Sequence, residues 1–363
     1  MKKLLLKTFG VSLMLLLSTV SYAVSETEPN DTKLTANIAV PGENNTGEAA
    51  ISQNQDWWEI TIPANGDLTI TTTPDGVHLW CYLYDNDGTT LLASSYSTGA
   101  FNVSRNDLAA GTYYLRFNCY YAGGFTDYNF TAILTEPSVP GDLEPNNQSV
   151  LANTLGLNDS TTGNVGYYYN LSRDTSDWFT VTTIEDGPLY IYLEPLYAQH
   201  LWAYLYDTDG ITLLASSYDN AAFSINRQDL AAGTYLIRVK PYYTSGYTPY
   251  KLSNESIPLA ITNDEENNDV VGSAVTIPPN STFEGHIGYY TNGARDIDDW
   301  YEITTTEDGI LNFNLTPSLV QHTWMYLYDS DGITLLASDY SNTAFSLYRL
   351  DLAAATYYLR VRM

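Results

Sequence analysis

The sequence predicts an all-β protein built from three tandem antiparallel β-sandwich domains, and three observations carry this prediction. One long stretch occurs three times, at residues 78–117, 200–239 and 322–361, with a constant step of 122 residues. Nearly every segment is short, alternates apolar with polar residues and ends at Gly, Pro, Asn or Asp, which is typical of strands in a sandwich. After the first 23 residues no window keeps a helical period.

Residues 1–23 are predicted to be a cleavable secretion signal. Basic residues precede an apolar run at 11–20, and Ser21 and Ala23 place small residues where a signal peptidase inspects the chain. The run is too short to cross a bilayer comfortably, and no later segment is long and apolar enough to do so. We therefore expect a protein that is secreted or held at the cell surface, with no membrane span after signal removal.

Acidic residues dominate the charge of the chain. Its Asp and Glu number 42 against 15 Lys and Arg, which gives a formal net charge of −27. Such a chain repels nucleic acid and anionic lipid, so neither is an expected partner, and it is well suited to bind divalent cations. An aromatic content of 13% with regular apolar alternation argues against disorder as the reason for the acidity.

Each repeat spans roughly 120 residues, more than the usual solenoid unit, so each is expected to have its own core. The predicted domains are residues 24–136, 141–254 and 262–363. A Pro-rich linker at 136–141 and a second linker at 253–263 join them. The first two copies continue into a last strand, at 128–134 and 247–252, which the third copy does not show. An edge of the third sandwich should therefore stay open, either because the chain is a fragment of a longer one or because a partner supplies the strand.

Within each repeat the expected elements follow one order. An acidic, Asn-rich opening is followed by a Gly turn with a weak strand, and then by an Asp-Trp signature that begins the next strand. A strongly alternating strand and the repeated stretch come after it. In that stretch the Leu and Ala positions face one side and the Trp and Tyr positions the other, because side chains alternate along a strand. The weak strands are expected around Gly47, Gly163 and Gly285.

An Asp-x-Asp-Gly sequence interrupts each repeated stretch, at 85–88, 207–210 and 329–332. It resembles half of an EF-hand loop, but Leu stands where the first acidic ligand would be, and the later Glu is absent. A hairpin turn explains the motif, with the Gly adopting a positive φ. We therefore predict a turn here and not a calcium loop.

Together these segments resemble the bacterial pre-peptidase C-terminal (PPC) domain family. The motifs are the Glu28-Pro29-Asn30-Asp31 opening with its copies, the Asp-Trp pair, the Leu-Tyr-Asp-x-Asp-Gly hairpin and the Ala-Gly-Thr-Tyr-Tyr-Leu-Arg strand. They cover almost all of the chain after residue 23. The resemblance implies a jelly-roll-like sandwich found beside secreted proteases and other exported enzymes, with no catalytic site of its own. It also implies calcium and collagen binding, which collagenase-borne members show.

The acidic openings and the Asp-Trp signatures are the predicted Ca²⁺ sites. Calcium takes several oxygen ligands from carboxylates and Asn side chains, and the resemblance implies that the opening and an Asp-x-x-Asp before the aromatic pair share the ion. Gln53 replaces the first of these aspartates in repeat 1, so a weaker site is expected there. The alternative is an acidic linker with Asx turns. The predicted ligands are Glu26, Glu28, Asn30, Asp31, Asp56, Asp142, Glu144, Asn146, Asn147, Asp174, Asp177, Asp264, Glu266, Asn268, Asp269, Asp296 and Asp299.

A strip of aromatic residues on one strand of each repeat is the predicted ligand-binding surface. Such a strip can stack sugars or hold an extended peptide. The alternative is that these rings pack into the core or against a neighbouring domain. The residues are Trp80, Tyr82, Tyr84, Trp202, Tyr204, Tyr206, Trp324, Tyr326 and Tyr328.

Two cysteines, Cys81 and Cys119, both lie in the first repeat and are both predicted to face one core. In an exported protein a disulfide between them is one interpretation and two buried thiols are the other. The spacing does not show whether their strands adjoin, so both remain open.

No catalytic motif is present, and threefold repetition of every acidic cluster argues against one unique active site. The sequence predicts a non-catalytic secreted array, stabilised by calcium, that serves as an adhesion, targeting or spacer element of an exported hydrolase or surface protein. The expected partner is an extracellular polymer, a polysaccharide or a protein fibre. Two alternatives stay open: a dedicated polysaccharide- or collagen-binding protein, and a fragment of a secreted peptidase precursor whose catalytic domain is absent.

Overall fold

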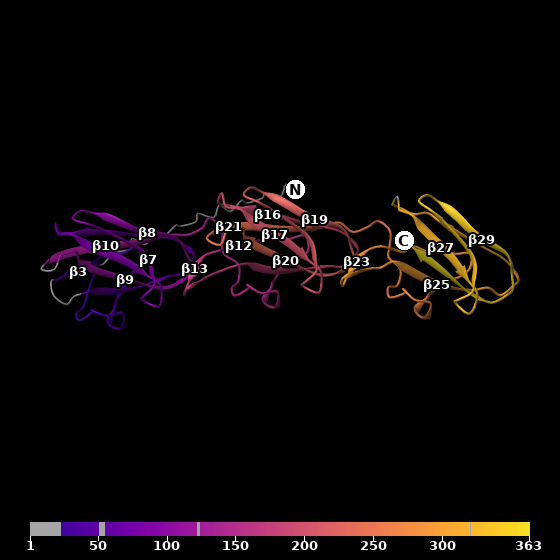
Figure 1. Ribbon diagram of the computed structural model, residues 1–363, viewed down its shortest axis with the longest axis horizontal. Helices are drawn as coiled ribbons and strands as arrows, with labels where there is room; N and C mark the ends of the chain where they lie inside the picture. The colour runs from indigo at the N-terminus through magenta and orange to yellow at the C-terminus, as the bar shows by residue number, and fades with distance from the viewer. Residues whose placement is uncertain (1–22, 51–54, 122–123, 320) are drawn as a thin grey trace, which may run out of the picture. The chain divides into compact units, whose positions relative to one another are not determined.

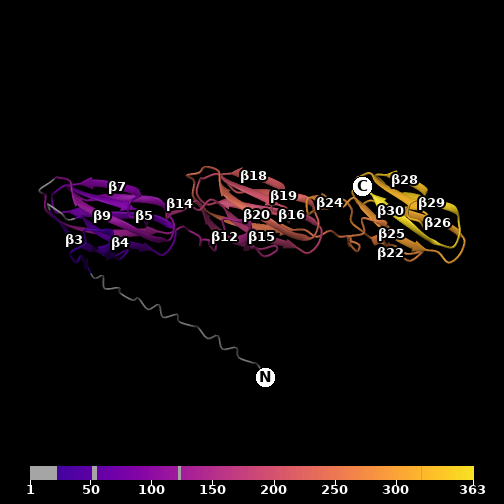
Figure 2. The ribbon, with the colours of Figure 1, turned by 60° about the horizontal axis from the view of Figure 1, so that its bottom comes forward.

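The computed structural model describes residues 23–50, 55–121, 124–319 and 321–363, and in these residues the chain is almost entirely β-structure. Figures 1 and 2 show strands throughout the coloured part of the chain. The helical segments within the described ranges are three short 3-10 turns: η1 (Lys33–Thr35), η2 (Ser149–Leu151) and η3 (Val271–Ser273). The predicted all-β class is confirmed. Residues 1–22 of the predicted signal lie outside the described ranges.

The chain divides into two compact units. Unit 1 comprises Met1–Glu136, as far as it is described, together with Tyr168–Ser172, and unit 2 comprises Pro137–Tyr167 and Arg173–Met363. The core consists of separate hydrophobic clusters, and each of the three repeats contributes its own large cluster. The short segment Tyr168–Ser172 belongs to the second repeat by sequence but packs within unit 1.

The first repeat is a sandwich of two sheets with a shared core. One sheet has the order β2 (Asn37–Ala39), β4 (Asp56–Ile62), β9 (Gly111–Cys119), β6 (Leu79–Tyr84) and β7 (Leu91–Ser97). The other has the order β1 (Val24–Ser25), β3 (Asn45–Ala49), β10 (Thr126–Thr135), β5 (Gly66–Pro74), β8 (Phe101–Leu108), β13 (Tyr168–Tyr169) and β14 (Ser172–Arg173). Alternation decides which side chains enter the core: Leu79, Cys81 and Leu83 of β6 are fully buried.

The second repeat has the same two sheets. Its first sheet has the order β11 (Asn153–Thr154), β15 (Asp177–Thr183), β20 (Gly233–Pro241), β17 (Leu201–Tyr206) and β18 (Leu213–Asp219). Its second has the order β12 (Ser160–Val165), β21 (Thr248–Ser256), β16 (Gly187–Pro195), β19 (Phe223–Leu230), β23 (Tyr290–Thr291) and β24 (Ala294–Arg295). The buried Leu201, Ala203 and Leu205 of β17 repeat the core face of β6.

The third repeat has one complete sheet and one reduced sheet. The complete sheet has the order β22 (Val275–Thr276), β25 (Asp298–Thr304), β30 (Thr356–Arg362), β27 (Thr323–Tyr328) and β28 (Leu335–Ser341). The reduced sheet pairs only β26 (Gly309–Leu315) with β29 (Phe345–Leu352).

The weak strand predicted around Gly285 is wrong, because residues 281–287 form no strand. Its counterparts β3 and β12 each pair with the last strand of their repeat, β10 or β21. No described residue supplies such a strand to the third repeat, so the segment around Gly285 has no partner for its ladder.

Among the residues that the structure describes, no helix is long and apolar enough to cross a membrane.

Candidate functional site

Each acidic opening is a tight loop organised around one buried asparagine. The side-chain Nδ2 of this asparagine donates to the first acid of the opening. The three pairs are Asn30–Glu26 (3.2 Å), Asn146–Asp142 (2.5 Å) and Asn268–Asp264 (2.8 Å). In repeats 1 and 2 the backbone N–H of the asparagine also donates to the second acid, Glu28 or Glu144. The loop therefore folds its own carboxylates around a buried amide.

The Asp-Trp signature begins a strand beside this loop. The backbone N–H of the tryptophan donates to the carbonyl oxygen of the buried asparagine at 3.0–3.1 Å in all three repeats. The pairs are Trp57–Asn30, Trp178–Asn146 and Trp300–Asn268. The aspartate just before each tryptophan, Asp56, Asp177 or Asp299, is consequently buried against the opening. This explains why the opening and the signature recur together in the sequence.

Three carboxylates converge at this junction in repeats 1 and 2. One ligand oxygen from each of Glu26, Glu28 and Asp56 lies within 4.8 Å of the others. The oxygens of Asp142, Glu144 and Asp177 meet the same limit. Asp264, Asp296 and Asp299 occupy the corresponding region of repeat 3, where Glu266 accepts a hydrogen bond from the Asn263 side chain (2.6 Å).

Several oxygen atoms at these junctions are buried and have no hydrogen-bond partner among the described residues. The clearest is the side-chain Oδ1 of the central asparagine, because it recurs in every repeat: Asn30, Asn146 and Asn268. Their side chains are at most 1% exposed. The Oδ1 atoms of Asp177 and Asp299 are also buried without a hydrogen-bond partner among the described residues. A buried polar atom without a partner costs about 1–3 kcal/mol, so any group that contacted these oxygen atoms would offset that cost.

Burial and mutual repulsion raise the pKa values of these carboxyl groups. Desolvation, reinforced by Glu26, raises the pKa of Asp56 to about 8. Desolvation and Asp296 raise the pKa of Asp299 to about 9, and Asp269 adds a smaller repulsion. Asp177 is shifted in the same direction by burial and by Asp174. A bound divalent cation would reverse this effect, because it favours the ionised form of every carboxylate around it.

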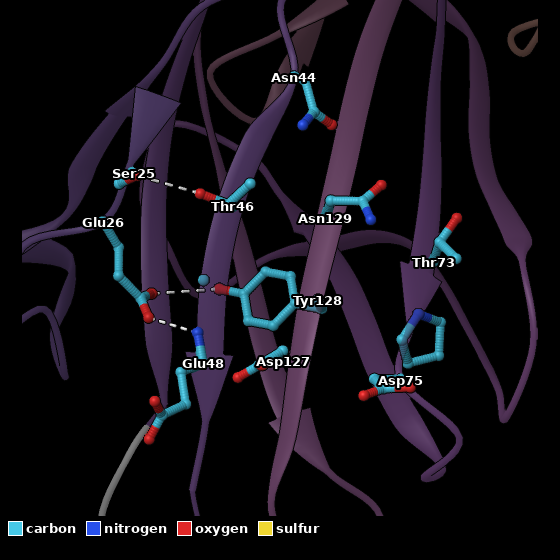
Figure 3. A pocket seen from close by; sticks show the side chains of 12 residues that line it. Ser25, Glu26, Asn44, Thr46, Glu48, Thr73, Asp75, Asp127, Tyr128 and Asn129 are labelled. Carbon is cyan, nitrogen blue, oxygen red and sulfur yellow. Dashed lines mark hydrogen bonds between the residues drawn. The ribbon is translucent and has the colours of Figure 1, made fainter. Parts of the chain in front are cut away.

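The last strand of the sandwich completes the site in repeats 1 and 2. Figure 3 shows Glu26 at the edge of a shallow pocket, where its carboxylate accepts hydrogen bonds from the Tyr128 hydroxyl (3.4 Å) and from the backbone N–H of Glu48. In repeat 2 the Tyr250 hydroxyl donates to Asp177 (2.6 Å). Each tyrosine hydroxyl packs against a glycine, and a larger residue there would collide with it. A Cβ on Gly163 would lie 2.3 Å from the Tyr250 hydroxyl oxygen.

Two of the predicted ligands in repeat 2 have structural partners instead. The Asn147 side-chain oxygen accepts the backbone N–H groups of Thr175 (3.0 Å) and Ser176 (3.2 Å), so it closes the loop before the strand. The Asp174 carboxylate accepts the N–H groups of Ser176 and Gly166. Gln53, expected to weaken the site of repeat 1, lies outside the described residues.

The predicted aromatic strip lies on the outer face of the first sheet in each repeat, opposite the core face. Along β6, Trp80 stacks on Tyr82 (ring centroids 5.2 Å apart) and, in the other direction, on Tyr120 (5.9 Å). The Arg116 guanidinium lies 4.4 Å from the centroid of the Tyr82 ring. Trp202, Tyr204 and Tyr206 stack in the same way in repeat 2, and Trp324, Tyr326 and Tyr328 in repeat 3. The rings mostly cover one another's faces.

Tyrosines at one end of the strip are the exposed part of this surface. In repeat 1 Tyr121 is 60% exposed and packs edge-on against Tyr120 and His78. In repeat 2 the corresponding Tyr243 is 56% exposed and contacts Tyr242 in the same way. We call these groups the tyrosine clusters: His78, Tyr96, Tyr120 and Tyr121, and His200, Tyr218, Tyr242 and Tyr243. They offer ring faces and hydroxyls that the strip itself does not.

The two cysteines are free thiols in the structure. Cys81 is fully buried, whereas Cys119 is partly exposed. Their strands do adjoin, but the register places Cys81 opposite Phe117 and Cys119 opposite Leu79. Such diagonal positions lie about 7–8 Å apart, and although their Cβ atoms are somewhat closer, they remain farther apart than the roughly 4 Å between Cβ atoms that a disulfide needs. The interpretation with a disulfide therefore does not fit this register.

The Asp-x-Asp-Gly motif forms the predicted turn but also has a role that the sequence analysis missed. Asp85 is fully buried, and its carboxylate accepts the backbone N–H groups of Asn170 (3.1 Å) and Leu171 (2.6 Å) within unit 1. In unit 2 the buried Asp207 accepts the N–H of Gly293 (2.6 Å). Asp85 and Asp207 thus each hold the tip of a hairpin that belongs by sequence to the next repeat.

Both hairpin tips have two central residues with positive φ, as in a type I′ turn. The tips are Asn170-Leu171 and Asn292-Gly293. A sequence signal for them existed: the segments 163–177 and 285–299 are longer than their counterpart 47–56 in repeat 1.

Removing one turn aspartate should loosen its hairpin. In Asp207→Ala the N–H of Gly293 loses the buried carboxylate that accepts it, and we expect a loss of about 1–2 kcal/mol in stability, because hydrogen bonds to charged groups are stronger than neutral ones. Hydrogen exchange of residues 289–295 measures the effect locally. Asp329→Ala is the matched control, because the Asp329 carboxylate accepts only the N–H of Ser330 among the described residues. Equal effects of the two substitutions would contradict the assigned role.

The fold and these sites define a class of protein, an all-β chain of sandwich modules with buried acidic junctions. Residues 18–128 match the family model described as "Galactose binding domain-like" (GBD_T9SS_assoc). The match covers less than a third of the chain, and in that part the chain is similar to a galactose-binding-like domain described as associated with T9SS. No curated protein sequence matches the chain.

Three solved structures illustrate the low similarity of the chain to known folds. The pre-peptidase C-terminal domain of a collagenase from Bacillus anthracis is 21% identical, with 29% of this chain and 94% of that chain covered and a TM-score of 0.25. The exported protein XepA is 8% identical, with 60% and 88% covered and a TM-score of 0.20. A tandem CBM22 domain from Paenibacillus barcinonensis is 10% identical, with 61% and 93% covered and a TM-score of 0.18.

Proposed function

We propose that the chain is a non-catalytic exported module array whose acidic junctions bind Ca²⁺ and that serves as a targeting, adhesion or spacer element. The observation that carries the calcium part is the orphaned Oδ1 of Asn30, Asn146 and Asn268, buried next to converging carboxylates. Carboxylate and amide oxygens are the donors that calcium prefers. The cation would join the opening loop to the first residue of the Asp-Trp strand and offset the repulsion between the acids.

The test is a thermal melt of residues 24–363 in millimolar calcium and in chelator. The proposal requires a higher melting temperature with calcium, and no comparable rise with magnesium, which demands near-ideal octahedral geometry and gives up its water ligands reluctantly. Identical melts in calcium and chelator would overturn the calcium part. The acidic openings would then be linkers folded by their own hydrogen bonds.

A second role, binding of an extracellular polymer, is supported by the tyrosine clusters. Exposed aromatic groups of this kind suit stacking on sugars or on an extended protein fibre. The stacked rings of the strip present mainly their edges, so the exposed Tyr121 and Tyr243 should contribute most.

Substitution of both residues by serine should reduce retention on insoluble polysaccharide or collagen at least about tenfold, since aromatic stacking contributes roughly 1 kcal/mol or more per ring. A pull-down on each polymer measures it. Tyr348→Ser is the control, because Tyr348 is 61% exposed on β29, in the other sheet. Equal retention of all three proteins would rule the clusters out as the binding surface.

A further inference from the structure

The outer face of the second sheet in repeat 2 presents two tyrosines on β16. Tyr190 and Tyr192 alternate with three buried aliphatic residues of that strand, so both rings point away from the core. Their planes are nearly parallel, at 14°, and their centroids lie 6.4 Å apart. Tyr192 is 40% exposed. The strand lies inside the sheet, between β21 and β19 (Figure 1), so a ligand would reach these rings from the face of the sheet and not from an edge.

The fold does not require aromatic residues at these two positions. The corresponding strands of repeats 1 and 3, β5 and β26, pair with the strand that corresponds to β19 in the same register. They form with small polar residues in place of the tyrosines: Thr69 and Thr71 in repeat 1, and Asn312 and Asn314 in repeat 3. An exposed aromatic pair that the strand itself does not need points to a binding role.

Short polar side chains leave a hollow around Tyr192. The register places Ser224 of β19 on one side of this tyrosine and Ser253 of β21 on the other. Ser160 of β12 lies next to Ser253 in the same row across the sheet. A serine side chain is too short to cover a neighbouring tyrosine ring. The hollow has a volume of about 480 Å³, which is within the usual range of small-molecule sites.

Hydrogen bonds at the hydroxyl groups hold the two rings in place. The Tyr192 hydroxyl donates to the Glu255 carboxylate (2.9 Å). The Gln228 amide donates to the Tyr190 hydroxyl (3.2 Å) and to the Asn226 side chain (2.9 Å). The ring orientations are therefore set before a ligand arrives, which lowers the entropy cost of binding.

Charged residues at the other end of the hollow nearly balance one another. Lys251 donates to Glu194 (3.1 Å), and both side chains are about half exposed. With Glu255 the face carries one positive and two negative groups, next to serine hydroxyls and amides that can both donate and accept. Such a surface suits an uncharged ligand that has apolar C–H faces for stacking and hydroxyl groups around its edge.

Other ligand classes fit this face less well. A peptide cannot add as a further strand, because β16 and β21 each have a paired strand on both sides, and strand addition needs a free edge. A nucleic acid could stack its bases on the rings, but its phosphates would approach a chain with a formal net charge of −27. The donor and acceptor groups and the two rings together favour a sugar.

We propose that the outer face of β16, β19 and β21 in repeat 2 is a carbohydrate-binding site, in which Tyr190 and Tyr192 stack on the rings of an uncharged glycan. The serines around Tyr192 and the amides of Asn226 and Gln228 bond to its hydroxyl groups. The site lies on the other sheet from the tyrosine cluster of this repeat and contains none of the proposed calcium ligands. It therefore goes beyond the proposed function.

Affinity electrophoresis of residues 24–363 tests this site, in native gels that contain galactan, mannan, xylan or a soluble β-glucan. We expect retardation in at least one gel. Tyr190→Thr combined with Tyr192→Thr should raise the dissociation constant at least about tenfold, because both stacking surfaces are lost. Repeat 1 carries threonine at both positions, so this variant should keep its fold and its melting temperature. Tyr348→Thr is the matched control and should bind as the unsubstituted chain does, since it removes a single exposed tyrosine from β29.

Two further variants separate this site from the alternatives. Tyr192→Phe keeps the ring and loses only the hydroxyl, so it should bind within about threefold of the unsubstituted chain. Tyr121→Ser combined with Tyr243→Ser removes the exposed rings of the tyrosine clusters. Loss of binding in the threonine variant supports the site whether or not the cluster variant also loses binding. No retardation in any gel, equal retardation of the threonine variant, or a loss confined to the cluster variant would overturn the proposal.

Discussion

In chelator, the melting temperature of residues 24–363 should fall as the pH rises from about 5 to about 9, and calcium should abolish this fall. The folded-state pKa of Asp56 is raised from 3.8 to about 8 and that of Asp299 to about 9. Between the unfolded and folded values the folded state binds more protons than the unfolded chain. Stability must therefore decrease with rising pH across that window.

Calcium reverses the preference of these carboxyl groups, from the protonated to the ionised form. The ion stabilises the carboxylate form, so proton binding no longer favours the folded state. At a hundred times its dissociation constant, calcium should add about 2.7 kcal/mol per occupied site at neutral pH. Melts followed by circular dichroism across this pH range, with and without calcium, measure both effects. A melting temperature that is flat with pH in chelator would contradict the burial and repulsion assigned to these acids.

Asp177→Asn should have opposite consequences in the two buffers. In chelator it should keep or raise the stability of repeat 2 near pH 8, because it removes a charge from a fully buried position next to Asp142 and Asp174. The Tyr250 hydroxyl keeps an acceptor in the Asn side chain. In calcium the same substitution should remove most of the gain, about 2 kcal/mol, because a carboxylate ligand is lost.

Hydrogen exchange of the backbone amides of β15 and β21 measures the stability change in repeat 2 separately from any change in the other two repeats. Asp209→Asn is the matched control, since Asp209 lies fully exposed in the hairpin turn and bonds only to its own turn, through Ile211 and Thr212. It should respond to calcium as the unsubstituted chain does. If Asp177→Asn destabilised the chain equally in both buffers, the Asp177 carboxylate would have a structural role and would not be a calcium ligand.

Much of this architecture was predictable because it is local. Alternation along β6 and β17 identified the core face, since Leu79, Cys81, Leu201 and Ala203 need only their own strand to decide their side. The acidic opening and the Asp-Trp signature were grouped by repetition and family resemblance. The structure adds the reason, a hydrogen bond from the tryptophan N–H to the buried asparagine.

The features that escaped prediction depend on distant partners. Asp85 has a complete local explanation as a turn residue, so nothing nearby indicated that it also accepts Asn170 and Leu171. The strand expected around Gly285 fails because a strand needs a neighbour, and the sequence pattern of one segment does not show whether a neighbour is present. The relation of the two cysteines required the register of β6 and β9.

The central claim is that the acidic junctions are cation sites, and a calcium titration followed by isothermal calorimetry tests it most directly. Chelator-treated residues 24–363 and a chain with Asp56→Asn, Asp177→Asn and Asp299→Asn are titrated with calcium at neutral pH. We predict saturable binding to the first protein, with a stoichiometry of one to three ions per chain, and a loss of binding of at least about tenfold in the second. Absence of saturable heat with the unsubstituted protein, or the same isotherm for both, would contradict the account.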